Sequence, residues 1–287
     1  MQKIPLIWNI TQACPWNCSF CCINAYYLPL SSESLETELE ETKRKKIELS
    51  LEDKLNIVDN LDMQSFDIDV SGGEPLLFNE NVGIIGRLSK KFGTNNISIT
   101  TTGKGLALVN MGTLKEIVGE IGFTYDFPYE PNSLRPQGYN SSNLEQIKRV
   151  VRVGIRTMAQ VPLTKLNVDK EIIEEIYRNL TNARVNGLHL IKFFPVGRGA
   201  HRLDLSLTNQ EYQTAIKVYK EVEQSQGPKV YVQTALKNPR RNSSHLNITS
   251  QGLLLSDPWA YDHHGEPLKE SILGDLRYQK FSEIAKL

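Results

Sequence analysis

The residues best suited to chemistry are four cysteines that lie close together near the start of the chain. Cys14, Cys18, Cys21 and Cys22 are the only cysteines among 287 residues, and they fall within nine positions. Thiolates select soft metal centres such as zinc, copper(I) or iron–sulfur clusters. The C-x3-C-x2-C spacing of the first three suits a single loop wrapped around one such centre. We therefore expect a metal site here.

Three kinds of cysteine site compete for this pattern. A disulfide framework is disfavoured, because such frameworks spread their cysteines through a small secreted domain. A structural zinc site uses four ligands, so the adjacent Cys21 and Cys22 would both have to turn inward. A centre held by Cys14, Cys18 and Cys21 leaves one coordination position open. In that arrangement Cys22 is a small buried residue or a thiol beside the ligands.

A second short stretch joins the cysteines, and together the two resemble a known family. Cys14, Cys18 and Cys21, with the aromatic Phe20 before the last, resemble the C-x3-C-x-aromatic-C signature of radical S-adenosylmethionine (radical SAM) enzymes. Gly72-Gly73-Glu74-Pro75 resembles the GGEP segment of that family and follows about fifty residues later. The resemblance covers roughly residues 1–200.

The resemblance implies two cofactors and a type of reaction. In this family three cysteine thiolates hold a 4Fe-4S cluster, and the remaining iron binds S-adenosyl-L-methionine. An electron from the cluster cleaves the sulfonium bond and releases a 5'-deoxyadenosyl radical, which takes a hydrogen atom from the substrate. A flavodoxin or ferredoxin-type protein is the expected reductant.

Several further residues are expected to bind the nucleotide cofactor. Gly72 and Gly73 let the backbone approach a ligand closely, and their carbonyls, with Glu74 nearby, suit the ammonium group of the cofactor. By the same resemblance we expect further contacts from hydroxyl, amide, guanidinium and aromatic side chains: Thr101, Thr102, Asn167, Arg135, Phe20 and Phe194. An ordinary turn, strand, surface ion pair or core aromatic is the alternative for each.

No residue is marked as catalytic by the sequence alone. Cys22, Tyr125 and Tyr129 are candidates for donating a hydrogen atom to a substrate radical. His263, in the pair His263-His264, is a candidate for acid–base chemistry. Its surroundings are rich in Asp, Gly, Glu and Pro, which also fits an ordinary loop.

Strands and helices are expected to alternate along most of the chain. Periodicity predicts strands over 4–10, 66–70, 96–102, 121–125, 157–163 and 188–196. Helices are predicted over 51–61, 81–92, 111–118, 143–153, 170–185 and 208–223, with Ser50 and Thr208 as capping residues. This order predicts an α/β fold, a partial (β/α)6 TIM-like barrel. The cysteines, Gly72-Gly73, Thr101-Thr102 and Gly197-Arg198-Gly199 all follow strands, so they should meet at one end.

The end of the chain is expected to form a small C-terminal cap. Residues 247–255 read as a hairpin with its turn at Gln251-Gly252. The order of segments after it is similar to the SPASM and Twitch branches of the family, which carry cysteines for auxiliary clusters here. This chain has none after Cys22, which implies a single cluster. We divide the chain into a barrel, residues 1–235, and a cap, residues 236–287.

Composition excludes several other classes of protein. The net charge is zero and the pI is about 7.0, so no overall field favours nucleic acid. The longest apolar runs are too short to span a membrane, and no signal peptide is visible at the start. We expect a cytoplasmic protein, where thiols stay reduced. The charged segment 31–46 is a solvated insertion or helix, or a lid that orders over substrate.

These observations lead to one expected function and two alternatives. We expect a radical SAM enzyme that abstracts hydrogen from a small natural-product, sugar or nucleotide-type substrate. Modification of a ribosomal peptide or protein, as by a peptide maturase or a glycyl-radical activase, is the alternative of the same chemistry. A metal-binding module with a purely structural role is the alternative without catalysis.

Overall fold

The fold is that of a computed structural model, which describes residues 3–30, 35–63, 65–130, 132–232 and 245–285. The expected boundary between residues 235 and 236 lies outside this range, as do residues 31–34 of the charged segment. The division into a barrel and a cap therefore stays a prediction.

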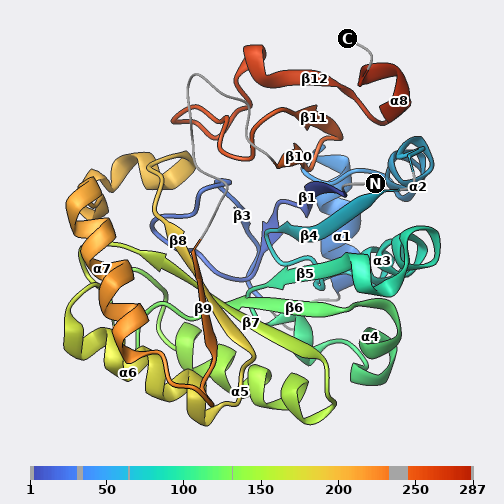
Figure 1. Ribbon diagram of the computed structural model, residues 1–287. Coiled ribbons are helices and arrows are strands. Elements are labelled where there is room, and N and C mark those ends of the chain that lie inside the picture. The colour runs from blue at the N-terminus through green and yellow to red at the C-terminus, as the bar shows by residue number, and fades with distance from the viewer. Residues whose placement is uncertain (1–2, 31–34, 64, 131, 233–244, 286–287) are drawn as a thin grey trace.

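A ten-stranded sheet forms the centre of the part that the structure describes (Figure 1). Its order is β12-β11-β10-β1-β4-β5-β6-β7-β8-β9, and all neighbours from β10 to β9 are parallel. The strands are β1 (Ile4–Thr11), β4 (Phe66–Gly72), β5 (Ile97–Thr101), β6 (Glu120–Thr124), β7 (Arg156–Leu163), β8 (Gly187–Lys192), β9 (Lys229–Val232), β10 (Leu246–Ile248), β11 (Leu253–Leu255) and β12 (Ile272–Asp275). The short strands β2 (Ala13–Cys14) and β3 (Tyr26–Tyr27) pair separately. The α/β fold and the partial TIM-like barrel are confirmed.

Helices surround the sheet on its outer side in Figure 1. They are α1 (Leu35–Arg44), α2 (Leu51–Asn60), α3 (Asn79–Phe92), α4 (Met111–Ile117), α5 (Tyr139–Arg152), α6 (Lys170–Asn182), α7 (Asn209–Val222) and α8 (Phe281–Ile284). The predicted caps are confirmed: the Ser50 side chain accepts from the Asp53 amide, and Thr208 forms a capping box with Glu211. Such caps satisfy amides that would otherwise lack a partner at the start of the helix.

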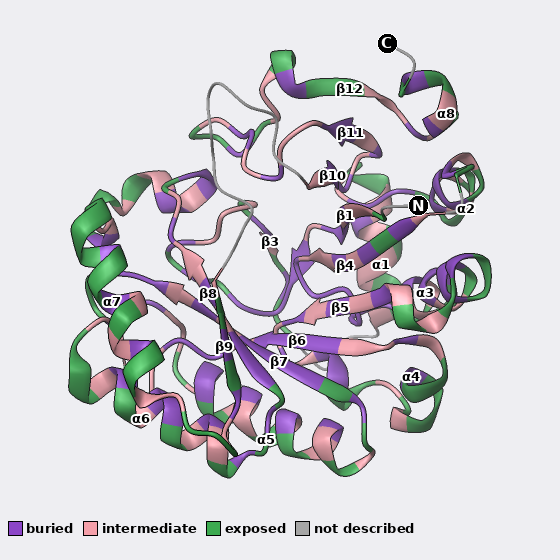
Figure 2. Ribbon diagram, viewed as in Figure 1, coloured by how far each residue is buried: buried purple, intermediate pink, exposed green. Residues whose placement is uncertain are grey.

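The two faces of the sheet carry opposite chemistry. Alternate side chains of β1, β4 and β5, such as Trp8 and Ile68, pack with helices α2 and α3 in one apolar core. Those of β7 and β8, such as Leu190, pack with α6 and α7 in a second core. Figure 2 shows buried residues interspersed with partly buried or exposed ones along these strands, and exposed residues on the outer sides of the helices.

The side chains on the other face, which we call the inner face, are mostly polar. Because side chains alternate along a strand, this face carries Asn9, Asp67, Asp69, Ser98, Thr100, Glu120, Thr124, Gln160, His189 and Asn247. The interior of a closed TIM barrel is usually filled with bulky branched residues. The inner face is therefore not built as a hydrophobic core.

The C-terminal segment extends the main sheet. Its strand β10 pairs in parallel with β1, and the predicted hairpin joins β10 to β11 with Gly252 in a left-handed conformation at φ 86°. Leu254 and Phe281 share the apolar core of Trp8 and Ile68. Strand β9 is a further parallel strand beyond the predicted six; its four residues are too few for a clear periodic signal.

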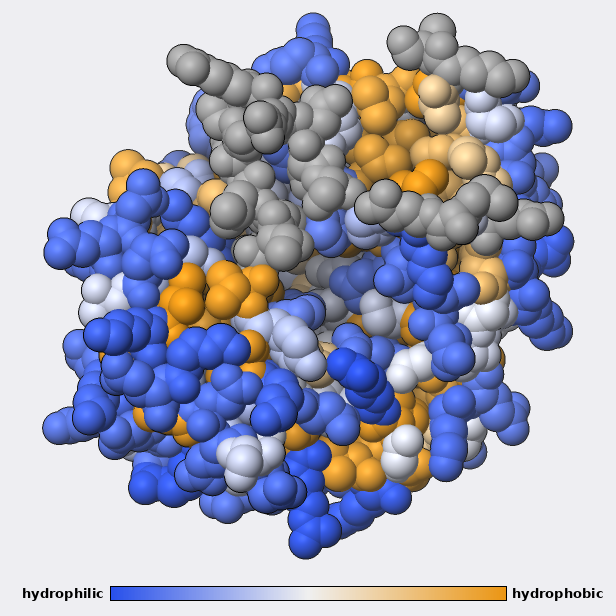
Figure 3. Space-filling model, viewed as in Figure 1, coloured by the Kyte–Doolittle hydropathy of each residue, from blue (hydrophilic) through white to orange (hydrophobic). Residues whose placement is uncertain are grey.

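The outer surface is mostly hydrophilic over the helices, while apolar residues gather over β11 and β12 (Figure 3). Ile272 and Leu273 of β12 are among them and are exposed. In the part of the chain that the structure describes, no helix is long and apolar enough to cross a membrane.

Candidate active site

The loops that follow the parallel strands are bonded to one another at one edge of the sheet. The Gly73 amide, after β4, donates to the Thr11 carbonyl at the end of β1 over 2.8 Å. The Arg198 amide, after β8, donates to the Cys21 carbonyl over 3.0 Å. The Asn167 side chain, after β7, donates to the Asp126 carbonyl, after β6. The strand ends therefore bring the predicted signatures together, as a parallel sheet requires.

The loop after β1, residues 14–22, is called the cysteine loop below. Cys14 and Cys18 are buried with Trp16 and Tyr139 in a small cluster, and Cys21 packs against it. As the side chains lie, no three His, Cys, Asp or Glu residues of the described chain form a group that could hold a metal ion. The three thiols nevertheless share one small site.

The chemistry of the three thiols fits a soft metal centre. Burial raises the pKa of Cys14, and the charges of Cys21 and Cys18 raise it further. Burial likewise raises the pKa of Cys18. Thiolates that repel one another in a buried site are stabilised by a shared cation, and rotation about Cα–Cβ moves a sulfur without moving the backbone. Desolvation raises the pKa of Cys22 as well, to about 12.

Gly72 and Gly73 are needed for a close approach between two segments of the protein. A Cβ on Gly72 would lie 2.4 Å from the Thr11 carbonyl oxygen, and one on Gly73 would lie 2.2 Å from the Ala13 carbonyl oxygen. Gly72 also has φ 123°, a conformation that favours glycine. We expected these glycines to admit a cofactor; the structure shows that they first admit the segment entering the cysteine loop.

Glu74 connects the loop after β4 to the loop after β5. Its fully buried carboxylate accepts hydrogen bonds from the hydroxyls of Thr101 and Thr102 and from the amides of Thr102 and Leu76. Burial raises the pKa of Glu74, and these four donors oppose that effect. The predicted site residues Glu74, Thr101 and Thr102 thus form one unit.

Arg135 forms an ion pair with the side-chain carboxylate of Asp126. Its Nε and Nη2 donate to Asp126 Oδ2 at 2.9 Å and 2.6 Å, and its Nη1 lies 3.3 Å from Cys18 Sγ. The guanidinium also lies over the rings of Phe20 and Tyr139, 4.4 Å from each centroid. Asp126 Oδ1 is buried and has no hydrogen-bond partner among the residues that the structure describes. Arg135 therefore positions Cys18 and Phe20. The sequence had led us to expect a contact with the cofactor carboxylate, and it did not indicate this positioning role.

Gly197 and Arg198 hold the backbone of the cysteine loop from the end of β8. A Cβ on Gly197 would lie 2.5 Å from the Cys22 carbonyl oxygen. The Arg198 side chain donates from Nε to the Cys18 carbonyl at 3.1 Å and from Nη1 to the Ala25 carbonyl at 2.9 Å. The sequence correctly predicted that these residues follow a strand at the same end of the sheet as the cysteines. It did not indicate that Arg198 bonds to the backbone of the cysteine loop.

Asn167 and Phe194 lie in different surroundings. Asn167 is fully buried; its amide donates to two backbone carbonyls and its oxygen accepts from the amide and hydroxyl of Thr164. A ribose contact would require one of these bonds to open. Phe194 is partly buried and packs against Trp259, with ring centroids 5.0 Å apart.

The four catalytic candidates do not form one group. Tyr125 is buried in the helix-covered core, where Asn179 of α6 donates to its hydroxyl. Tyr129 and His263 are exposed. The His263 loop still lies beside the cysteine loop, since the Asn24 amide donates to the neighbouring His264 carbonyl. Of the four, Cys22 alone belongs to the cysteine loop.

Solved structures share this fold. The SuiB protein of Streptococcus suis bound to S-adenosylmethionine aligns with 99% of this chain and 65% of its own, at 12% identity and a TM-score of 0.68. SuiB bound to precursor peptide SuiA aligns with 99% and 64%, at 11% identity and a TM-score of 0.65. The protein anSMEcpe with bound AdoMet aligns with 98% and 79%, at 16% identity and a TM-score of 0.65. The chain thus spans just under two thirds of SuiB.

The sequence itself gives the family. None of the curated proteins compared with the chain matches it. The family model described as Radical SAM superfamily matches residues 8–199, which is more than half of the chain. That range contains the cysteine loop, Gly72-Gly73-Glu74-Pro75 and Gly197-Arg198. The chain belongs to the radical SAM superfamily.

Proposed function

We propose that the protein is an enzyme that cleaves S-adenosyl-L-methionine reductively and abstracts a hydrogen atom from a small substrate. The observation that carries this proposal is the support of the cysteine loop. Arg135 after β6 and Arg198 after β8 contact the loop itself, and Gly73 after β4 holds the segment that enters it, at Thr11. A loop fixed in this way keeps its thiols in place while a bound cofactor reacts.

Cys14, Cys18 and Cys21 are the residues that would hold a single 4Fe-4S cluster with S-adenosyl-L-methionine on its open iron. When bound, this pair supplies the electron and the 5'-deoxyadenosyl group. Arg135 donates toward Cys18 and so stabilises negative charge on that sulfur. Gly72, Gly73 and the Glu74 unit form the adjoining edge for the cofactor. A flavodoxin or ferredoxin-type protein of the cytoplasm is the proposed reductant.

The substrate class is part of the proposal. A small natural product, sugar or nucleotide-type molecule is favoured, because the polar inner face leads directly to the cysteine loop. A peptide is the second candidate, supported by the shared fold with SuiB, which has been solved with precursor peptide SuiA. Activation of a glycyl-radical enzyme is a further possibility of the same chemistry. A SPASM- or Twitch-like branch without auxiliary cysteines agrees with either substrate.

Anaerobic reconstitution with iron and sulfide, followed by dithionite and S-adenosyl-L-methionine, tests the reaction. We expect about four irons per chain and slow formation of 5'-deoxyadenosine. A colourless zinc protein that leaves S-adenosyl-L-methionine intact would instead indicate a structural metal module. Incubation of the reduced enzyme with candidate small molecules and peptides then identifies which class accelerates nucleoside formation.

A further inference from the structure

The inner face of the sheet carries a carboxylate that several strands hold in place. We propose that Asp69 binds an ammonium or guanidinium group of the substrate, so that the substrate is a cationic molecule. This inference rests on the proposed function, because it concerns what that enzyme binds. Asp69 lies in β4, on the strand that leads to Gly72 and Gly73.

The carboxylate of Asp69 is oriented by two hydroxyls from the neighbouring strand. Ser98 donates to Oδ1 at 2.9 Å and Thr100 donates to Oδ2 at 2.8 Å. Because both neighbours act as donors, the arrangement suits an ionised carboxylate. A carboxylate accepts up to about four hydrogen bonds, so Asp69 retains capacity for a ligand.

The support for Asp69 extends across two further strands. Gln160 of β7 donates from Nε2 to the Thr100 hydroxyl at 2.8 Å, passing over Gly122 of β6. A Cβ on Gly122 would lie 3.2 Å from that Gln160 nitrogen and 3.3 Å from the Thr100 hydroxyl. The glycine leaves room for the bond. Hydrogen bonds from two other strands, β5 and β7, therefore orient the carboxylate on β4, which is more support than an exposed acidic residue receives.

Asp69 has no cation of its own among the described residues. Burial raises the pKa of Asp69, the hydrogen bonds from Thr100 and Ser98 lower it, and the negative charge of Asp67 raises it. Arg156 is paired with Glu120 at 2.7 Å, so its charge is already matched by another carboxylate. Desolvation lowers the pKa of His189, so its imidazole favours the neutral form. An ionised carboxylate that is partly shielded from water and has no counterion is costly, and a cationic ligand reduces that cost.

The position of Asp69 within β4 suits a residue that binds a substrate inside the sheet, away from the strand ends that carry the cysteine loop. Asp69 precedes Gly72 by three residues, so the rise along a strand puts it about 10 Å from that end. A molecule anchored at Asp69 would extend along β4 toward the strand ends. The anchor is thus separate from the thiols and from the Glu74 unit.

A second polar group flanks the same row of the sheet. Ile7 of β1 pairs with Asp69 on one side and with Asn247 of β10 on the other. The Asn247 amide donates to the Tyr261 hydroxyl at 2.7 Å, and Asn9 donates to the Asn247 oxygen. A cavity of about 60 Å³ opens beside Asn9 and Tyr261. These groups offer neutral hydrogen bonds to the uncharged part of a substrate.

Binding of defined cations tests the proposal without knowledge of the natural substrate. The probes are agmatine, which carries a guanidinium, and 1,5-diaminopentane, with glutarate as an anion of similar length. Calorimetry of the reconstituted full chain should show that a cation binds and glutarate does not. Asp69→Asn should weaken cation binding at least about tenfold, the loss expected for a hydrogen bond to a charged group. Asp67→Asn, an exposed carboxylate of the same strand, is the matched control and should change it less than about threefold.

Two outcomes would overturn the proposal. One is the absence of binding by either cation, and the other is equal binding by the wild type and Asp69→Asn. Asp69→Ser, which matches the neighbouring Ser98, replaces the asparagine variant if that protein does not show a cooperative melt. Iron content and 5'-deoxyadenosine formation by the wild type are measured on the same sample. Loss of those two with intact cation binding would reject the proposed function and leave the cation site standing.

Discussion

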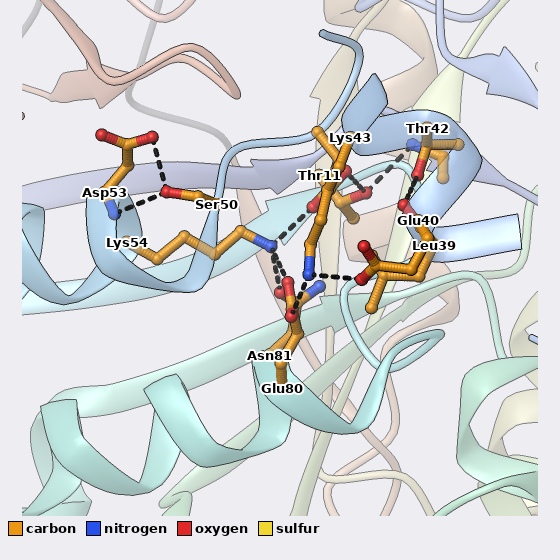
Figure 4. Close-up of polar contacts among 12 residues, drawn as sticks. Thr11, Leu39, Glu40, Thr42, Lys43, Ser50, Asp53, Lys54, Glu80 and Asn81 are labelled. Atoms are coloured by element: carbon orange, nitrogen blue, oxygen red, sulfur yellow. Dashed lines mark hydrogen bonds and ion pairs between the residues drawn. The ribbon is translucent and has the colours of Figure 1, made fainter. Parts of the chain in front are cut away.

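Two groups of buried charges lie near the cysteine loop, and they differ in what their cations contact. The first, here called the Lys54 cluster, comprises Lys54, Glu80, Asn81 and Thr11, which are labelled in Figure 4, and Glu48, which bonds to Lys54 and Thr11. The second, the Arg135 cluster, comprises Arg135, Asp126 and Cys18. Both contain an arginine or lysine removed from water, which is stable only with partners.

In the Lys54 cluster the cation is fully satisfied. The Lys54 ammonium, with no exposed surface, donates to Glu48, Glu80 and Asn81 at 2.7, 3.0 and 2.7 Å. Those are all three of its donors. Glu48 in turn accepts from the Thr11 hydroxyl at 2.6 Å. Since the Thr11 carbonyl accepts from Gly73, the cluster supports the segment that enters the cysteine loop.

The Arg135 cluster differs in what its cation contacts. Among the described residues, Asp126 Oδ1 and Nη2 of the nearby Arg198 are buried without a hydrogen-bond partner, as is Asn81 Nδ2 of the Lys54 cluster. The Arg135 guanidinium contacts a thiol that is expected to carry charge only when ligated. Buried polar atoms without partners are uncommon, and both clusters contain one. We infer from the contacts that the Lys54 cluster serves the fold, because its cation donates to Glu48, Glu80 and Asn81. The Arg135 cluster serves the ligand, because its cation contacts the thiol of Cys18.

Loss of a thiol beside the Arg135 cluster should have the largest effect. Cys18→Ala removes one of three proposed ligands, so we expect loss of the iron–sulfur chromophore and of all S-adenosyl-L-methionine cleavage. Cys22→Ala is the matched control within the same loop and should keep both. Iron analysis, visible absorbance and nucleoside formation measure the difference. A Cys22→Ala protein that cannot be loaded with iron would overturn the ligand assignment.

Removal of the cation from the Lys54 cluster should destabilise the fold. Lys54→Met leaves the buried carboxylate of Glu48 without its ion pair, which costs about 3–5 kcal/mol. The double variant Lys54→Met, Glu48→Gln should recover part of that loss, because no uncompensated charge remains. Urea unfolding monitored by circular dichroism measures the free energy of unfolding. Equal stability of the single variant and the wild type would contradict the assignment of this cluster to the fold.

Alanine variants of two glycines distinguish the cost of a left-handed backbone from a steric clash with the cysteine loop. Gly197 and Gly138 both have positive φ, 56° and 81°. A methyl group on Gly138 meets nothing within 4 Å, while one on Gly197 meets the carbonyls of Cys21 and Cys22. Both alanine variants should lose about 1–2 kcal/mol from the left-handed backbone. Only Gly197→Ala should also lower the iron retained after gel filtration; equal retention by both would remove the proposed role of Gly197.

Much of this site could be predicted from sequence because its signals are local. The cysteines, Gly72-Gly73-Glu74 and the capping residues Ser50 and Thr208 are short patterns with fixed spacing. Because strands and helices alternate and the strands are parallel, every loop that leads from a strand to a helix lies at the same end of the sheet.

The contacts between distant segments could not be predicted. Arg135 contacts Cys18 across 117 positions of the chain, and Arg198 reaches it across 180. The same holds for Lys54, which is fully buried although no local pattern in the sequence indicates this. A single sequence states which residues are polar but not which of them meet, because pairing depends on how the helices pack.

The smallest expected effect concerns the partner that the Lys54 cluster shares with α1. Glu80 accepts hydrogen bonds from Lys54 and from Lys43, which ties α1 to α3. Burial acts to raise the pKa of Glu80, but these two cations lower it overall. A carboxyl with a lowered pKa in the folded protein contributes stability above its unfolded pKa, and that stability is lost as pH falls through the folded value.

Glu80→Gln should therefore remove this contribution at pH 7, and the loss should be small because Gln still accepts hydrogen bonds and Lys54 keeps Glu48. It should flatten the loss of stability below the ordinary glutamate pKa of 4.5. The pKa of Glu48 is raised by burial, so its contribution has the opposite sign, and the difference between variant and wild type isolates Glu80. Melting temperatures between neutral pH and acid measure it. Identical acid profiles would mean that water screens the charge of Glu80. The stabilising contacts of Lys54 would then be those with Glu48 and Asn81.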